Sequence, residues 1–150
     1  GIDLQKTLID TGREEQLVFI TAHGDIPMCA QAMKAGAVDF LPKPFKPKEL
    51  LESVERALSR SAEQLLRASE RNRAVALLQQ LTPREYEVME LVATGLLNKQ
   101  VGGELGMAEK TVKTHRAHVM QKLGITSVAE LMVVLQKAEV TPPVRPGTKV

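Results

Sequence analysis

The segment 81–124 limits the possible folds most strongly, because helix-start and helix-stop signals divide it into three short helices. The motif Thr82-Pro83-Arg84-Glu85 begins the first helix, with a hydroxyl at the N-cap, proline at the first helical position and glutamate at the third. Gly95, Gly106 and Gly124 each supply a helix stop. Since short amphipathic helices must bury their apolar stripes against one another, we expect a helical domain here.

The remaining boundaries of this domain follow from the same kind of signal. Asn98 is expected to cap the second helix, and the third helix is expected from about Glu109 to Leu123. Ser127 and Glu130 have the spacing of a second capping box and predict a fourth helix.

The third helix has an unusual charge pattern. The formal charge of the 150 residues is only +2, yet no acidic residue occurs from Lys110 to Ala129. The basic side chains of this stretch are Lys110, Lys113, Arg116 and Lys122, to which His115 and His118 can add. This pattern is typical of a surface that binds a phosphate backbone.

Helical periodicity indicates which side chains of the third helix can meet DNA. At about 100° per residue, a helix with Val112 pointing inward also points Val119 and Leu123 inward. The opposite face carries Lys110, Thr114, Ala117 and Gln121, flanked by Lys113 and His118. We therefore predict base-edge contacts from Lys110, Lys113, Thr114 and Ala117, and phosphate contacts from Lys99, Thr111 and His118.

Two residues of this helix are predicted to be structural. Arg116 lies about 40° from the inward direction, which favours a salt bridge to Glu85 or Glu90 over a base contact. His115 is expected to be partly buried and hydrogen-bonded inside the core. Together with His118 it forms no convincing metal site, because a third ligand is missing.

Residues 1–60 alternate between strand-like and helical patterns. The apolar run 16–21 predicts a buried strand, residues 23–25 a turn, 26–35 a helix ended by Gly36, and 38–41 a second strand. Strand, helix and strand in this order form one parallel crossover unit of an α/β fold. A proline-rich loop, 43–47, follows.

A long helix is predicted from Lys48 to about Leu81, which contains no glycine or proline. Two interpretations are open. The helix either packs on the preceding sheet and continues as a charged linker, or it forms a dimeric coiled coil in which Asn72 sets the register. The coiled-coil interpretation rests on eight residues that recur at alternating intervals of three and four positions: Leu51, Val54, Leu58, Ser61, Leu65, Ala68, Asn72 and Val75.

Composition and the cysteine count predict a cytoplasmic protein. No apolar run is long enough for a membrane span, and the single cysteine, Cys29, is compatible with a reducing cytoplasm. Residues 141–150 are rich in turn formers and are expected to be a disordered tail. The domains expected are 1–58, a helical linker 59–79, a helical domain 80–140, and the tail.

The helical domain resembles the LuxR-type DNA-binding domain of NarL/FixJ response regulators. The resemblance rests on segments 81–85, 95–96, 98–99, 105–106, 111–115 and 122–124. It implies that the third helix recognises DNA and that the fourth commonly contributes to a dimer. Ala108 and the pair Gly102-Gly103 depart from the family pattern, and each is expected to weaken a helix by roughly 1 kcal/mol.

Residues 2–58 resemble the second half of a response-regulator receiver domain. The resemblance implies that Thr21 is the switch hydroxyl, Phe40 the switch aromatic, and Lys43 the lysine that pairs with phosphoryl oxygens, with a cis bond to Pro44. The acceptor aspartate and the acidic pair that binds Mg²⁺ would precede Gly1, and Asp3 is a poor acceptor. We therefore expect an incomplete piece of a longer regulator, with a naturally truncated form as the less favoured alternative.

These patterns predict a sequence-specific DNA-binding transcriptional regulator of a bacterial two-component system. The expected fold is a partial α/β receiver, with two parallel strands and flanking helices, joined by a long helix to an all-α four-helix domain. Expected partners are double-stranded DNA, a second copy of the chain and a sensor histidine kinase, with no membrane. We expect no enzyme activity and no cofactor, since Mg²⁺ serves only an intact receiver. The alternative is a truncated dimerisation module that pairs with the full-length regulator.

Overall fold

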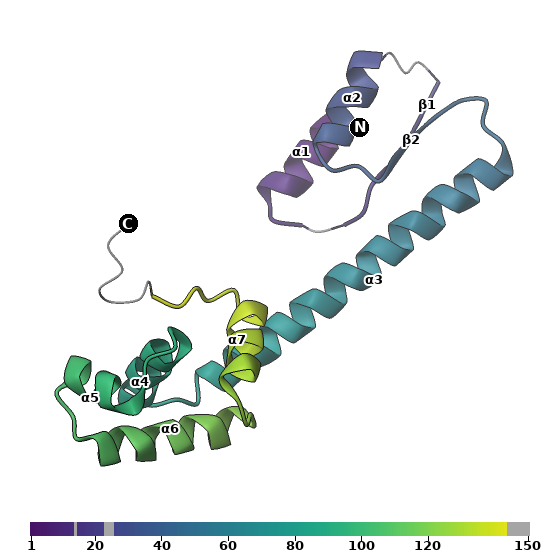
Figure 1. Cartoon of the computed structure of the whole chain (residues 1–150). Coiled ribbons are helices and arrows are strands. Elements are labelled where there is room, and N and C mark those ends of the chain that lie inside the picture. Colours follow the sequence, from purple (N-terminus) through teal and green to yellow (C-terminus); the bar gives the residue numbers. More distant parts are fainter. Residues whose placement is uncertain (14, 23–25, 144–150) are drawn as a thin grey trace. The chain divides into compact units, whose positions relative to one another are not determined.

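The computed structural model describes residues 1–13, 15–22 and 26–143 (Figure 1). The predicted turn 23–25 and most of the predicted tail, 144–150, lie outside these residues, and 141–143 form neither helix nor strand. The elements are α1 (Ile2–Asp10), β1 (Val18–Thr21), α2 (Ile26–Lys34), β2 (Asp39–Pro42), α3 (Pro47–Leu78), α4 (Pro83–Ala93), α5 (Asn98–Leu105), α6 (Glu109–Leu123) and α7 (Val128–Lys137).

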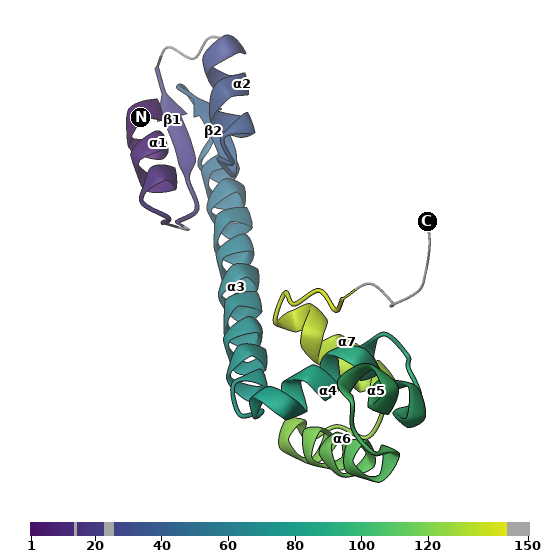
Figure 2. The same ribbon diagram turned by 90° about the vertical axis from the view of Figure 1, so that its left-hand side faces the viewer.

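The chain forms two compact units, residues 1–66 and 67–150, and the division falls within α3 (Figure 2). The first unit has helices and a parallel sheet, and the elements described in the second are all helices. The expected fold class is therefore confirmed. No single helix in the described ranges is long and apolar enough to cross a membrane. The one bent pair that would qualify by length and composition, α6 with α7, contributes core residues to the second unit.

The sheet of the first unit has two parallel strands. Phe19 is paired with Phe40 and Thr21 with Pro42, and the two phenyl rings stack with centroids 6.1 Å apart. Because side chains alternate along a strand, these four residues share one face of the sheet. Ile20 is exposed, as expected for a two-stranded sheet with open edges.

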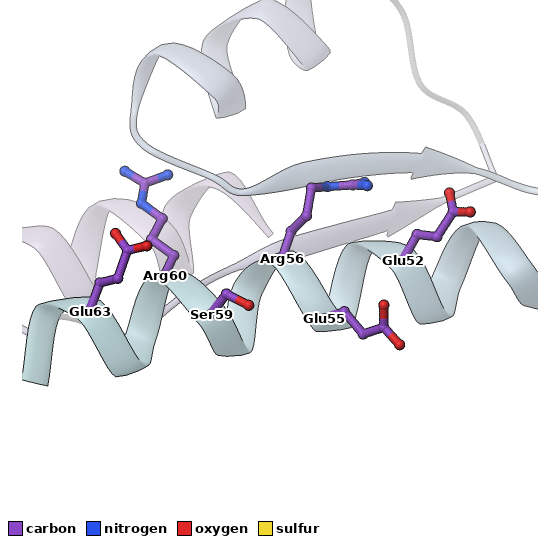
Figure 3. Close-up of a pocket in the computed structure, with 6 residues that line it drawn as sticks. All are labelled: Glu52, Glu55, Arg56, Ser59, Arg60 and Glu63. Atoms are coloured by element: carbon purple, nitrogen blue, oxygen red, sulfur yellow. The ribbon is translucent and has the colours of Figure 1, made fainter.

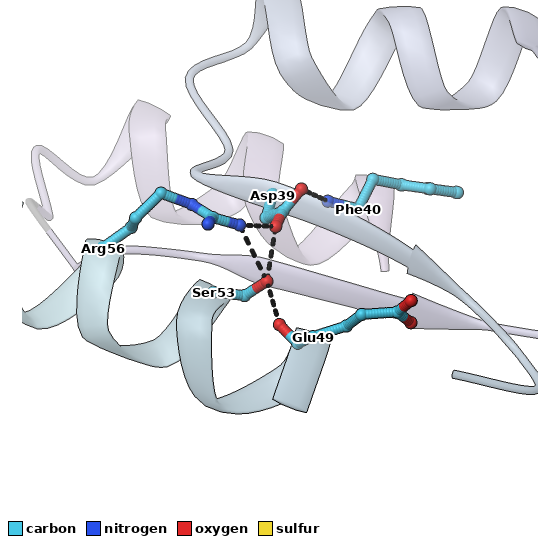
Figure 4. A network of polar contacts seen from close by, with 5 residues as sticks. All are labelled: Asp39, Phe40, Glu49, Ser53 and Arg56. Atoms are coloured by element: carbon cyan, nitrogen blue, oxygen red, sulfur yellow. Dashed lines mark hydrogen bonds and ion pairs between the residues drawn. The ribbon is translucent and has the colours of Figure 1, made fainter. Parts of the chain in front are cut away.

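A polar network anchors α3 to β2 (Figure 4). The Asp39 carboxylate accepts hydrogen bonds from the hydroxyl of Ser53 and the guanidinium of Arg56, and from the backbone nitrogen of Phe40 at 2.9 Å. Ser53 is fully buried and also donates to the carbonyl of Glu49 at 2.8 Å. The Ser53 hydrogen bond, aided by Arg56, lowers the pKa of Asp39, so its carboxylate stays charged and holds this contact.

A buried glutamine links the first two helices. Gln5 of α1 donates from Nε2 to the carbonyl oxygen of Ala32 in α2, at 3.0 Å, and both residues are buried. This hydrogen bond joins α1 to α2. Asp3 lies in the first turn of α1.

The second unit packs its five helical segments around one apolar core. Met89, Val101, Val112 and Leu131 are completely buried. Other buried members are Ala74, Leu78, Val88, Val92, Val119, Leu123, Leu135 and Ala138. Since Ala74 and Leu78 belong to α3, the last turns of that helix are part of this core.

The helix caps agree with the sequence fully in one case, partly in a second and not in a third. Thr82 and Glu85 form the predicted capping box. Ser127 accepts from the backbone nitrogen of Glu130, but the Glu130 carboxylate accepts from the nitrogen of Thr126, so the second box is only half formed. The prediction for Asn98 is wrong, because α5 is capped by the Gln100 side chain, which accepts from the Leu97 nitrogen at 2.9 Å.

The long helix is continuous over 32 residues and has two kinds of surface. Ser53 packs toward the sheet, and Val75 packs against the core of the second unit. Leu58, Leu65 and Asn72 are exposed. Packing on the sheet is therefore confirmed, whereas pairing with a second helix through the exposed leucines stays a hypothesis.

Candidate nucleic-acid interface

The recognition helix predicted from sequence is α6, and its two faces are those expected. Val112, Val119 and Leu123 are buried in the core of the second unit. The predicted base-reading residues Lys110, Lys113, Thr114 and Ala117 are all exposed, as are Thr111 and His118. The helix therefore presents small, polar and basic side chains to solvent along the surface opposite its core contacts.

Three lysines are available for an external partner. Lys110 and Lys113 on α6, and Lys99 in the first turn of α5, are exposed and form no ion pair or hydrogen bond within the described part of the chain. The hydroxyl of Thr114 donates to the carbonyl of Lys110 at 3.1 Å, so its methyl group is the part directed away from the helix backbone. This set combines unpaired positive charge with a small apolar group, which suits a DNA groove.

A buried carboxylate ties the end of α6 to the start of α4. Glu85 is only 4% exposed, and Lys122 donates to its Oε2 at 2.7 Å and to the carbonyl of Gln80 at 3.2 Å. The Lys122 hydrogen bond and that from the Thr82 nitrogen lower the pKa of Glu85 from 4.5 to about 2. Lys122 is thus a structural cation, although its sequence position suggested a free charge at the DNA surface.

His118 lies beside the same carboxylate. Its Nδ1 is 3.7 Å from Oε1 of Glu85, and about half of its side chain is exposed. This placement leaves the outer edge of the ring accessible at the flank of α6. A contact to phosphate from His118 stays a prediction.

The partner predicted for Arg116 is wrong. Its Nη1 donates to Oδ1 of Asn98 at 3.1 Å, while Glu85 is occupied by Lys122. His115 is half-buried as expected, but its buried Nδ1 has no hydrogen-bond partner among the described residues, so the predicted core hydrogen bond is not formed at that atom. The part of the chain that the structure describes contains no cluster of three side chains suited to a metal ion.

The two glycines of α5 have different structural roles. A Cβ atom on Gly102 would lie 2.6 Å from the carbonyl oxygen of Met107, whereas one on Gly103 would meet nothing within 4 Å. The Gly102 carbonyl also accepts from the Met107 nitrogen at 2.9 Å. Gly102 therefore permits the close turn between α5 and α6, a reason that helix propensity alone did not reveal.

The three switch residues expected in the first unit lie on the two strands or directly after them. Thr21 ends β1, Phe40 lies within β2, and Lys43 follows β2. The backbone nitrogen of Lys43 donates to the Thr21 carbonyl at 2.7 Å, which brings these two residues together at the carboxyl end of the sheet. The peptide bond between Lys43 and Pro44 is cis, as the resemblance implied.

A shallow pocket lies along one face of α3 (Figure 3). It is lined by Glu52, Glu55, Arg56, Ser59, Arg60 and Glu63. These residues carry charges of both signs along one exposed helix face, and Arg56 already binds Asp39. This arrangement is typical of a solvated helix surface rather than of a site for a small ligand.

Comparison with known proteins adds two family matches. Residues 79–135 match the family described as "Bacterial regulatory proteins, luxR family", and residues 1–55 match the "Response regulator receiver domain". Nodulation protein W of Bradyrhizobium diazoefficiens is 50% identical over 136 residues, which cover 88% of this chain and 58% of that protein. The transcriptional regulatory protein FixJ of Azorhizobium caulinodans is 37% identical, with 95% and 67% covered.

A solved structure agrees with these matches. The response regulator StyR is 47% identical, with a TM-score of 0.77 over 91% of this chain and 69% of that one. The chain spans 58% of nodulation protein W and 62% of the response regulator TmoT of Ectopseudomonas mendocina, so it corresponds to part of these relatives. From both family matches and these relatives, the chain belongs to the response regulators that join a receiver domain to a LuxR-type DNA-binding domain.

Proposed function

We propose that the second unit binds DNA in a sequence-specific manner and thereby regulates transcription. The observation that carries this proposal is the surface of α6, where Lys110, Thr114 and Ala117 are exposed opposite a buried apolar face, with Lys113 at the flank. Within the described part of the chain, neither lysine forms an ion pair. A helix of this width enters the major groove, and its first turns meet the base edges.

Within this proposal the side chains divide into two groups. Lys110 and Lys113 donate to acceptors on guanine, and the methyl groups of Thr114 and Ala117 contact a thymine methyl. Lys99, Thr111 and His118 bind phosphates, which fixes the orientation of the second unit on the duplex without reading sequence.

The first unit supplies control in this proposal. Phosphorylation of an aspartate in an intact receiver, by a sensor histidine kinase, promotes homodimer formation and binding to paired DNA half-sites. Lys43, placed beside Thr21 at the end of the sheet, neutralises charge on the phosphoryl group. Mg²⁺ is required for that transfer alone, the chain itself is not an enzyme, and the regulator acts in the cytoplasm.

A mobility-shift titration with DNA selected from a random pool tests the DNA-binding surface. Because the substitution removes the proposed contact between the Lys113 ammonium and a base, we expect Lys113→Ala to weaken specific binding by about 1–3 kcal/mol. The matched control is Lys6→Ala, which removes the same charge from the exposed surface of α1 in the first unit and should bind as the unmodified chain does. Equal affinities for Lys113→Ala and the unmodified chain would show that the assigned surface is wrong.

The alternative of a dimerisation module is less well supported. Matches to both a receiver and a DNA-binding domain favour a regulator that reads DNA. Co-purification of the chain with a full-length regulator, without any DNA binding by the chain alone, would favour the alternative instead.

A further inference from the structure

A single side-chain hydrogen bond joins the start of α5 to the middle of α6. Arg116 donates to Asn98 at 3.1 Å, across 18 residues of sequence, and both side chains are half-buried. Asn98 is the first residue of α5, and the exposed Lys99 follows it directly. The contact between α5 and α6 therefore lies one residue from Lys99 in the chain.

The opposite end of the same helix pair is fixed by backbone. There the Met107 nitrogen donates to the Gly102 carbonyl at 2.9 Å, and no room is left for a Cβ on Gly102. Two short helices held at two separated points have a defined relative orientation. The tight turn supplies one of these points, and the hydrogen bond between Arg116 and Asn98 supplies the other.

We propose that Arg116 is a positioning residue for DNA binding, which acts through Asn98 to hold Lys99 in register with the reading face of α6. This inference rests on the proposed function. Arg116 points toward α5 and is half-buried, whereas Lys113 on the same helix is exposed. The two residues thus have separate tasks, one in orienting α5 and one in contacting bases.

A positioning role of Arg116 changes the salt dependence of DNA binding, whereas a purely structural role leaves it unchanged. When the contact is lost, Lys99 no longer stays at its phosphate, so one ionic contact with DNA weakens. Affinity then falls and becomes less dependent on salt, because each phosphate contact contributes roughly 0.9 to the slope of log K against log salt concentration. Base preference is retained, because Lys113 and Thr114 are unchanged.

The test compares Arg116→Ala, Asn98→Ala, the double variant and Lys99→Ala, each in the full chain. Binding to the selected DNA site is measured over a series of salt concentrations, and thermal unfolding is recorded for every variant. Asn98→Ala is the most informative, because it changes no charge. Arg73→Ala removes one positive charge from the exposed surface of α3 and serves as the control for Arg116→Ala.

We expect Arg116→Ala and Asn98→Ala each to bind about three- to tenfold more weakly, with the salt slope reduced by up to roughly 0.9, as in Lys99→Ala. The double variant should bind no more weakly than either single variant, because both remove the same contact. Multiplying losses, or a lowered melting temperature with an unchanged slope, would overturn the inference. Failure of the unmodified chain to select any DNA would instead contradict the proposed function.

Discussion

Replacing each of the two adjacent glycines of α5 by alanine should change the free energy of unfolding of the second unit in opposite directions. Gly103→Ala places a methyl group in open space, so it should raise the free energy of unfolding of the second unit by about 0.5–1 kcal/mol through helix propensity. Gly102→Ala gains the same propensity but places its Cβ 2.6 Å from the carbonyl oxygen of Met107.

The size of the destabilisation expected for Gly102→Ala depends on which atoms must move to relieve the close contact. The contact lies well inside ordinary van der Waals separation, and its partner is backbone in a tight turn, so relief requires a shift of the whole turn. Overpacking of this kind costs typically about 1–3 kcal/mol, which leaves Gly102→Ala net destabilising. Because both variants gain the same propensity, they should differ by the overpacking cost alone, roughly 1–3 kcal/mol in free energy of unfolding.

Urea unfolding followed by tyrosine fluorescence measures the stability of the second unit, where both glycines lie. The chain has one tyrosine and no tryptophan, and Tyr86 packs against the core of the second unit. A change of 1 kcal/mol corresponds to about 4–8 °C in melting temperature for a unit of this size, so a thermal scan provides a second readout. If Gly102→Ala were as stable as Gly103→Ala, the close approach of α5 to the turn would be refuted.

Two further predictions concern the carboxylates whose pKa values are lowered, Glu85 and Asp39. Since the pKa of Glu85 is lowered to about 2, its contribution to stability is present above pH 4.5 and is lost as the pH falls toward 2. The urea midpoint from Tyr86 fluorescence should fall over that range and should do so less in Glu85→Gln; equal pH profiles for the two proteins would contradict the Lys122 contact. Asp39→Asn should destabilise the first unit by about 1–3 kcal/mol, since Ser53 and Arg56 lose a charged acceptor. Hydrogen exchange in β2 should speed up, whereas the exposed control Asp10→Asn should leave it unchanged, and equal rates in both variants would exclude this anchor.

The helices of the second unit were predictable because their signals are local. The Thr82 capping box and the left-handed glycines Gly106 and Gly124 lie within a few residues of the boundaries that they define. The inward position of Val112 on α6 likewise follows from helical periodicity alone. In the first unit, short apolar runs predicted both strands, with ends displaced by one or two residues.

The polar partners were not predictable because they depend on tertiary geometry. Lys122 and Glu85 are 37 residues apart, and either Arg116 or Lys122 had a charge suited to that carboxylate. The packing of α5 against α6 decides the choice by placing Asn98 beside Arg116. The requirement for Gly102 is of the same kind, since the carbonyl that excludes a Cβ belongs to Met107 in the following turn.

The central claim, that the exposed face of α6 reads base sequence, is tested most directly by selecting DNA from a random pool with the unmodified chain and with Lys113→Ala. We predict that the unmodified chain enriches related, paired half-sites. Lys113→Ala should enrich the same sites with a relaxed preference at the base that Lys113 contacts in each half-site. An identical consensus from both proteins, or no enriched sequence from the unmodified chain, would contradict the claim.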